Sequence, residues 1–376
     1  MVAKQVLIIG GGIAGITLAI FLKREGIEAS VYESYPYRKD AGAAFLLSPN
    51  ALRVLEKLDI KERIQQNGWK VTSMEMRNKQ GTLMMANYLV DEENQEHPMI
   101  YIARSDLMNS LLDKADLEGI KIHYGKKLDK IYQREDSVIA LFKDGTEAVG
   151  TQLIGADGIN STTRQRIFPE CTLKYAGYAI FQGLVSSEKI PHMNLNNMVA
   201  YSKGNLFIGI SRCHPSERNN YHCFGTIFTE RKIPTKEFEQ KTTEALRKEL
   251  LKVFEGWGDL VSSILTHTEK IYAKSRFEFA PLENWSRNRV TLIGDALHGT
   301  SPYTGQGVSV ALEDAWYMAT MLSQHDYKDA FYYFEYDRKP RIKELTDAST
   351  IELDFMNMFE KLKPPMKVED VKLAQF

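Results

Sequence analysis

The stretch VLIIGGGIAGITLAIFLKREGIEASVYES, residues 6–34, decides the fold of this chain. An apolar run leads into glycines, a helical apolar pattern follows, and a second apolar run ends at Glu33. That order, over about 30 residues, is typical of a β-α-β unit. We expect a strand at 4–9, a helix at 14–25 and a strand at 28–33. The stretch therefore predicts an α/β fold that opens on a Rossmann-like unit.

The glycines of this stretch have the spacing of a dinucleotide-binding turn. Gly10 permits the tight turn, Gly12 removes a side chain where a pyrophosphate approaches the backbone, and Gly15 lets helix and strand pack closely. The helix N-terminus then offers free N–H groups to the phosphates. Glu33 is placed to accept hydrogen bonds from both hydroxyls of a ribose. The motif predicts a site for an ADP-containing cofactor, but it does not separate NAD from FAD.

Composition excludes several classes of function. The chain has 376 residues, of which 43% are hydrophobic, and 48 basic against 49 acidic residues give a net charge of −1. Nothing in that balance indicates a nucleic-acid or membrane partner. Three cysteines are too few for a disulfide framework, which fits the cytoplasm. No run approaches the roughly 18 apolar residues of a membrane span, and no metal-ligand spacing is present.

Two distant motifs extend the opening one. LIGADGINSTTRQ (153–165) leads from a strand into Asp157-Gly158 and on to Arg164. VTLIGDALHGTSPYTGQGVSVALEDA (290–315) leads from a strand into Gly294-Asp295, and its second glycine pair opens a helix expected at 308–322. Such a helix start presents N–H groups to electron-rich oxygens.

The three motifs, in this order and at these separations, resemble those of the class A (single-component) flavin-dependent aromatic monooxygenases, the salicylate-hydroxylase-like family. The segments AGAAFLLSPNALRVLEKLDI and YDRKPR are also similar to family segments. The resemblance covers nearly the whole chain and is weakest at 175–270. It favours FAD over NAD as the cofactor held by the glycines.

The resemblance implies a role for each matched residue. Gly10, Gly12, Gly15 and Glu33 would hold the ADP half of FAD, and Arg104 would reach its phosphates or ribityl chain. Asp295 would bind the ribityl and pyrophosphate region, and Pro302, Gly305, Gln306 and Gly307 would lie along the flavin ring. Asp157 and Arg164 belong to a motif associated with FAD and with transient NAD(P)H. From the residues alone, Arg104 also reads as a surface ion-pair residue, Asp295 as a helix cap, and His298 as a structural hydrogen-bonding residue.

The resemblance also implies a division of the chain. The FAD-binding domain would comprise residues 1–72, 98–174 and 271–325. A mainly antiparallel β-sheet substrate domain, 73–97 and 175–270, would be inserted into it, and 326–376 would form a C-terminal helical segment. We expect the helix of 236–254 to be continuous, Ser105 to cap a helix, and Pro340 to break one.

The implied chemistry is hydroxylation. In the family, FAD takes hydride from NAD(P)H and reacts with O2, and a flavin hydroperoxide transfers one oxygen atom to an electron-rich ring. The substrate here would be an aromatic or polycyclic small molecule, and the protein a monomer or homodimer without nucleic-acid or membrane partners.

The substrate wall is expected in the sheet region 175–230. The candidate contacts are Gln182, Phe207, Ile210, His222 and Phe224. The local pattern is faintly similar to the tetracycline-inactivating branch, in which a Gln and a His of this sheet contact the drug, although the Arg contact of that branch has no counterpart here. A polar residue in a sheet is more often a hydrogen-bonding residue of the fold than a ligand contact.

Two alternatives remain open at the level of sequence. One is a flavin-dependent reductase or dehydrogenase of the same fold, which inserts no oxygen. The other is a flavin-bound protein that sequesters its ligand without turnover. A halogenase is disfavoured, because its Trp-x-Trp motif is reduced here to Trp257 alone.

Overall fold

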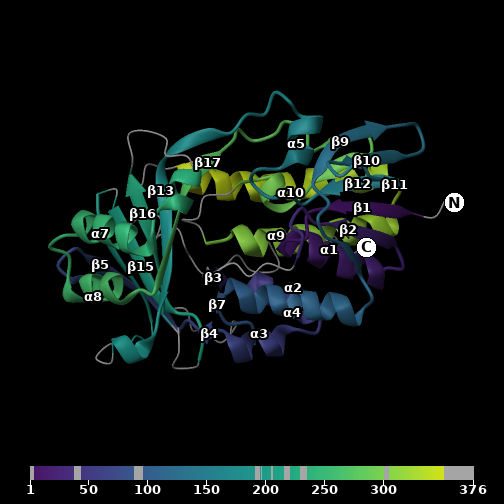
Figure 1. The fold of residues 1–376 in the computed structure, drawn as a ribbon. Coiled ribbons are helices and arrows are strands. Elements are labelled where there is room, and N and C mark those ends of the chain that lie inside the picture. Colours follow the sequence, from purple (N-terminus) through teal and green to yellow (C-terminus); the bar gives the residue numbers. More distant parts are fainter. Residues whose placement is uncertain are drawn as a thin grey trace.

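The computed structural model describes residues 4–37, 44–88, 96–190, 195, 197–204, 206–215, 221–228, 235–299 and 305–350. The described chain is mixed α/β. The two larger sheets lie at opposite ends of the molecule (Figure 1).

A six-stranded sheet is built around the opening stretch. Its order is β18-β19-β12-β1-β2-β8, and all neighbours are parallel except the edge pair β18–β19. The side chains of Val6, Leu7 and Ile8 in the central strand are fully buried. The strands are β1 (Gln5–Ile9), β2 (Glu28–Tyr32), β8 (Lys121–His123), β12 (Gln152–Gly155), β18 (Ser286–Arg287) and β19 (Val290–Leu292).

The parallel register brings the three motifs to one edge of this sheet. Ile9 pairs with Gly155, and Gly155 pairs with Leu292. These residues end β1, β12 and β19, and each is followed directly by its motif. Because the carboxyl ends of parallel strands meet at one edge, segments far apart in the sequence form one crevice there.

Helices pack against one another beside this sheet. α1 packs on α9 and α4, and α9 packs on α2 and α10. The helices are α1 (Ile13–Arg24), α2 (Pro49–Lys57), α3 (Lys61–Asn67), α4 (Arg104–Leu117), α5 (Thr162–Ile167), α9 (Gly307–Gln324) and α10 (Tyr327–Thr350).

Two small antiparallel sheets complete this part. One has the order β3-β7-β4 and the other the order β11-β10-β9. Their strands are β3 (Ala44–Leu47), β4 (Trp69–Lys70), β7 (Ile100–Ala103), β9 (Leu128–Gln133), β10 (Val138–Phe142) and β11 (Glu147–Gly150).

The second large sheet has seven strands in the order β17-β13-β16-β15-β14-β5-β6. Every neighbouring pair is antiparallel except β14–β5. The mainly antiparallel character expected of the inserted region is therefore confirmed. The strands are β5 (Ser73–Asn78), β6 (Leu83–Tyr88), β13 (Lys174–Val185), β14 (Met198–Lys203), β15 (Leu206–Arg212), β16 (Tyr221–Phe228) and β17 (Lys270–Glu278).

The two faces of this sheet have different partners. One face packs under helices that close a core around Phe181, Ile208 and Ile210 (Figure 1). The other face carries Phe207 and joins a cluster with Tyr101 of β7. The covering helices are α6 (Thr235–Gln240), α7 (Thr243–Val253) and α8 (Asp259–His267), and a short 3₁₀ turn, η2 (Ser187–Lys189), follows β13.

Four expectations about these elements need correction. The helix expected at 236–254 is two helices, because the Thr242 side chain accepts from Ala245 N–H and starts a new one. Ser105 lies inside α4, which begins at Arg104 directly after β7. Pro340 lies within α10 and does not end it, because arginines on both sides of it bond to α9. β17 belongs to the seven-stranded sheet, whereas the expected FAD-binding domain includes residues 271–278; the division into domains otherwise stays a prediction.

Candidate cofactor and substrate site

The glycine turn after β1 has a steric reason for each glycine. Gly10 has φ +108°, and a Cβ there would lie 2.5 Å from the carbonyl oxygen of Ala156. A Cβ on Gly15 would lie 2.0 Å from the carbonyl oxygen of Gly10. On Gly12, by contrast, a Cβ would meet no heavy atom within 4 Å. Gly10 and Gly15 are thus required by packing, whereas Gly12 leaves open space above the backbone.

That open space lies at the N-terminus of α1. Gly12 is the N-cap residue, and neither a capping side chain nor an acidic residue occupies the first turn among the residues described there. The first N–H groups of the helix therefore remain available to an anion, which the helix dipole also favours. The cradle that a Cβ would fill fits the pyrophosphate of an ADP-containing cofactor.

Glu33 stands over the same turn. Its Oε2 accepts from Gly11 N–H at 2.7 Å, and its Oε1 accepts from Tyr35 N–H at 2.7 Å. Oε1 also accepts from the Ser34 hydroxyl at 3.0 Å. A carboxylate oxygen has about two acceptor positions, so Oε2 keeps one for a ribose hydroxyl. The two backbone bonds fix the carboxylate beside the pyrophosphate cradle, which fits the ribose contact expected of it.

Asp157 organises the turn that follows β12. Its Oδ2 accepts from the N–H of Thr163 at 2.9 Å, and its Oδ1 accepts from the hydroxyl of Ser161 at 2.5 Å. Burial raises the pKa of Asp157, against the effect of these hydrogen bonds. The described contacts of this carboxylate hold the chain between β12 and α5, so contact with FAD stays a prediction for Asp157.

Arg164 joins this turn to the Gly-Asp turn, residues 294–298, that follows β19. Its Nη1 donates to the carbonyl of Ala296 at 2.8 Å, and its Nη2 donates to the carbonyl of Ile159 at 2.5 Å. The guanidinium lies over the ring of Phe279 at 3.9 Å. Arg164 is only 1% exposed. It therefore braces two loops in this structure, and it is not positioned at the surface to meet an arriving nicotinamide.

The Gly-Asp turn presents one acid to the crevice. Asp295 is exposed, whereas Gly294 and Ala296, its neighbours in the 3₁₀ turn η3 (Gly294–Ala296), are buried. A Cβ on Gly294 would lie 3.2 Å from the Cβ of Ala14, in the first turn of α1. The turn therefore borders the pyrophosphate cradle, and it carries Asp295 as an exposed carboxylate.

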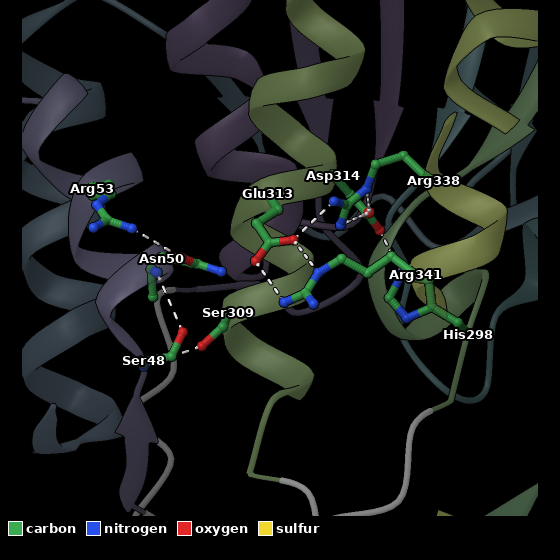
Figure 2. Close-up of polar contacts among 10 residues, drawn as sticks. Ser48, Asn50, Arg53, His298, Ser309, Glu313, Asp314, Arg338 and Arg341 are labelled. Atoms are coloured by element: carbon green, nitrogen blue, oxygen red, sulfur yellow. Dashed lines mark hydrogen bonds and ion pairs between the residues drawn. The ribbon is translucent and has the colours of Figure 1, made fainter. Parts of the chain in front are cut away.

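The buried carboxylate of Asp314 in α9 holds this turn by hydrogen bonds (Figure 2). Its Oδ2 accepts from Gly294 N–H at 3.0 Å and from His298 Nε2 at 2.5 Å. Burial would raise the pKa of Asp314, but His298, Arg338 and the Gly294 N–H hold it down, to about 2. His298 thus has the structural role expected of it.

The remaining cofactor candidates are placed as follows. Arg104 is the first residue of α4 and is partly buried. Gly305 has φ +62°, Gln306 is the N-cap residue of α9, and Gly307 begins that helix. Pro302 lies outside the described residues. Among the described residues, no side chain makes a capping hydrogen bond at the N-terminus of α9.

The strand register sorts the substrate candidates between the faces of the seven-stranded sheet. Gln182 pairs with Phe224, and residue 226, next but one to Phe224, pairs with Phe207. His222 follows the same alternation, so all four share the face toward β7. Ile210 pairs with Cys223 and lies on the opposite face, in the core under α7 and α8. The interpretation of Ile210 as a substrate contact is therefore wrong.

Sequence reasoning missed Tyr101, which meets this face from β7. Its hydroxyl lies 2.8 Å from His222 Nδ1. His222 also stacks on Phe224, with ring centroids 5.7 Å apart. Burial lowers the pKa of His222 to about 3 and raises the pKa of Tyr101 well above its usual value. The pair is therefore neutral at ordinary pH, and no local pattern around Tyr101 signals it.

The described residues contain neither a metal-binding cluster nor a helix able to span a membrane. Within those residues, no group of three His, Cys, Asp or Glu side chains is arranged to hold a metal ion. None of the helices there has both the length and the apolar character needed to cross a bilayer.

The glycine cradle, Glu33 and the exposed Asp295 lie at one edge of a parallel sheet, an arrangement that fits an oxidoreductase with a dinucleotide cofactor. The family model described as FAD binding domain matches residues 3–349, and the chain belongs to that family. The 3-amino-4-hydroxybenzoate 2-monooxygenase PtmB3 of Streptomyces platensis is 30% identical over 346 residues, which are 91% of this chain and 85% of that protein. The FAD-dependent urate hydroxylase of Klebsiella pneumoniae is 27% identical over 91% of this chain and 87% of that protein.

Solved structures share the fold. Klebsiella pneumoniae HpxO complexed with FAD and uric acid matches with a TM-score of 0.82 at 24% identity, covering 95% of this chain and 91% of that chain. The tetracycline destructase Tet(51) matches with a TM-score of 0.70 at 23% identity, covering 96% and 95%. The protein is a class A FAD-dependent aromatic monooxygenase, with FAD as its cofactor and NAD(P)H as electron donor.

Proposed function

We propose that the protein hydroxylates a small aromatic or heteroaromatic ring that carries an oxygen substituent. The observation that carries this proposal is the buried Tyr101–His222 pair, which meets Phe207 and Phe224 on one face of the seven-stranded sheet. Aromatic walls suit a flat ring, and one polar pair among them suits one polar substituent. The names of the relatives support it, since aminohydroxybenzoate and urate are compounds of this kind.

The protonation of the pair defines the substituent. Tyr101 keeps its proton, because the pKa of its phenol is raised, so its hydroxyl donates to His222 Nδ1 and the imidazole proton sits on Nε2. In the opposite tautomer, Nδ1–H of His222 would donate to the Tyr101 oxygen, and both the phenol proton and Nε2 would lack a hydrogen-bond partner. His222 Nε2 is buried and has no hydrogen-bond partner among the described residues. An acceptor oxygen on the substrate would satisfy it, and we expect that oxygen to displace apolar side chains on entering.

The remaining residues divide the work of the reaction. FAD, when bound, takes hydride from NAD(P)H and activates O2. Glu33 and the N-terminus of α1 hold the ADP half, and Asp295 holds the region beyond the pyrophosphate. The apolar sheet face orients the ring and excludes water, which protects the reactive cofactor state from unproductive collapse. Neutral His222 recognises the substrate by hydrogen bonding and not by charge, since its pKa of about 3 keeps the imidazole uncharged.

A tetracycline-type antibiotic is the second candidate substrate. One observation favours it: Gln182 and His222 lie on the same sheet face, as the loose similarity to the tetracycline-inactivating branch requires. The fold match to Tet(51) is compatible with this candidate but does not discriminate, because HpxO shares the fold as well.

A compound panel tests the proposal. The purified holoenzyme is mixed with NADH or NADPH and with hydroxybenzoates, hydroxypyridines, urate or tetracycline, and nicotinamide oxidation is followed. Products formed under ¹⁸O₂ are then weighed by mass spectrometry. We expect a hydroxylated ring carrying one labelled oxygen. Stimulated oxidation without label in the product would favour the reductase alternative, and ligand binding without stimulated oxidation would favour the sequestering protein.

A further inference from the structure

Asp314 is a single carboxylate with its two oxygens committed to different parts of the fold. Oδ2 accepts from Gly294 N–H and from His298 Nε2, both in the Gly-Asp turn. Oδ1 accepts from Arg338 of α10, from Nε at 3.1 Å and from Nη2 at 2.9 Å. Figure 2 shows this arrangement, in which the carboxylate lies between the turn and the C-terminal helix.

The contact between Asp314 and Arg338 is shielded from solvent, so water cannot take the place of either partner. The side chain of Asp314 is fully buried and that of Arg338 is 4% exposed. Arg338 also donates from Nη1 to Glu313 Oε2 at 2.8 Å, and Arg341 donates from Nε to the same oxygen at 3.1 Å. Two carboxylates thus face two guanidinium groups. Loss of one buried partner leaves an uncompensated charge that no nearby water can screen.

The Gly-Asp turn that Asp314 holds also borders the cofactor cradle at the N-terminus of α1. Gly294 has φ +58° and packs against Ala14 of α1, so its backbone has little freedom to shift. Asp295, the next residue of this turn, is exposed. The direction of the Asp295 side chain therefore depends on the backbone of residue 294, whose N–H is bonded to Asp314.

We propose that Arg338 and Asp314 are positioning residues for the flavin site, through which α10 sets the Gly-Asp turn and thereby how tightly FAD is held. The proposal rests on the assignment of Asp295 to FAD. It gives the C-terminal helix a part in cofactor retention, although α10 itself follows the last of the three motifs. Arg338 acts through Asp314 and the turn, and it needs no contact with the cofactor.

The test compares two arginines of α10. Apoprotein of wild type, Arg338→Met, Arg338→Lys and Arg341→Met is titrated with FAD, with flavin fluorescence giving the dissociation constant and visible circular dichroism reporting the flavin environment. Arg341 is the matched control, because it donates to Glu313, and the described hydrogen bonds of the Glu313 carboxylate come from arginines of α10 and not from the turn. The melting temperature of each apoprotein is measured alongside, since both substitutions disturb the buried cluster.

We expect Arg338→Met to weaken FAD binding about tenfold or more, the value of one lost charge-assisted hydrogen bond, and to change the flavin circular dichroism. Arg338→Lys should lie between it and wild type, and Arg341→Met should bind FAD as wild type does even where its melting temperature falls. Equal FAD affinity for Arg338→Met and Arg341→Met would overturn the proposal. If Arg338→Met does not fold, the comparison of Arg338→Lys with Arg341→Met decides in the same way.

The Asp295→Ala variant distinguishes the positioning role of Arg338 from the assignment of Asp295 to FAD. Weakened FAD binding in Asp295→Ala together with unchanged binding in the Arg338 variants overturns the positioning role alone. Unchanged binding in Asp295→Ala overturns the assignment of Asp295, and with it the route by which Arg338 is proposed to act. Substrate turnover is not needed for either reading, so failure of the proposed substrate class leaves both readings intact.

Discussion

Arg164 and Ala296, 132 residues apart in the chain, are joined by a hydrogen bond of 2.8 Å from guanidinium to backbone carbonyl. The bond ties the Asp-Gly turn after β12 to the Gly-Asp turn after β19. Asp314 holds the second turn from α9, so that turn is fixed on two sides. The crevice is therefore assembled from loops that brace each other and not from isolated motifs.

Removal of this brace should cost stability. Arg164→Met keeps much of the apolar volume but removes the donor from the buried carbonyl of Ala296 and from the partly buried carbonyl of Ile159, together with the contact with Phe279. We expect the free energy of unfolding of the apoprotein to fall by about 2 kcal/mol in urea denaturation. Arg166→Met is the control, since Arg166 is an exposed arginine of the same helix. Equal losses in the two variants would contradict the bracing role.

Substitution by alanine should lower the stability of the apoprotein at one glycine of the opening motif and leave it nearly unchanged at another. In Gly15→Ala the new methyl meets a backbone carbonyl at 2.0 Å, which cannot move without disturbing β1 and α1. We expect a loss of about 3 kcal/mol in the free energy of unfolding, measured on the apoprotein. Gly12→Ala adds a methyl to open space, at φ −80°, which alanine adopts readily.

Gly12→Ala should therefore leave apoprotein stability within about 0.5 kcal/mol of wild type but weaken FAD binding by about tenfold, because the methyl occupies the pyrophosphate cradle. FAD titration followed by fluorescence measures the effect. A Gly12→Ala protein that binds FAD normally would place the pyrophosphate elsewhere.

Glu33 offers a test of which cofactor occupies the opening motif. Glu33→Ala removes the carboxylate held by Gly11 and Tyr35, and we expect FAD to be released more readily, with a dissociation constant raised about tenfold. The ratio of kcat/KM for NADH to that for NADPH should not change, because the nicotinamide binds elsewhere. Glu28→Ala, at the exposed start of β2, the strand that Glu33 directly follows, is the control. A changed nicotinamide ratio in Glu33→Ala would mean that the motif holds NAD(P)H.

The cofactor crevice could be predicted from sequence because its signals are local. Each motif joins a short apolar run to glycines or acids, and parallel strands bring such turns to one edge whatever lies between them. The connections behind the crevice were not predictable in the same way. Asp314 and Arg338 are polar residues in helices, and only the three-dimensional packing of α9 on α10 shows that they meet.

The substrate face shows a different limit. Alternation sorts a strand into two faces, so Phe207 and Ile210, an odd number of residues apart, had to lie on opposite sides. Which face turns toward the flavin-binding part depends on the helices α7 and α8 covering the other one, and no local pattern states this. The contact of Tyr101 with His222 links residues 121 apart through the meeting of two sheets, which lies beyond any motif.

The buried His222 makes a prediction about pH. Its pKa is about 3 in the folded protein because of burial, against roughly 6.5 for an ordinary histidine in the unfolded chain. Between these pH values the unfolded chain binds a proton that the folded protein does not. Stability is therefore full above about pH 6.5 and falls as the pH is lowered toward 3, with a slope that approaches roughly 1.4 kcal/mol per pH unit for this one group.

Urea denaturation of wild type and His222→Gln between about pH 7.5 and 5 measures this effect. The range stops at about pH 5 because most carboxylates stay ionised above it. We expect the wild-type free energy of unfolding to fall more steeply than that of His222→Gln, with the difference emerging below about pH 6.5. His267→Gln is the control, because His267 lies in α8 at the partly exposed end of the helix, away from Tyr101. Parallel curves for wild type and His222→Gln would mean that His222 takes up its proton at the same pH in the folded and the unfolded protein, so that it would carry a charge below about pH 6.5.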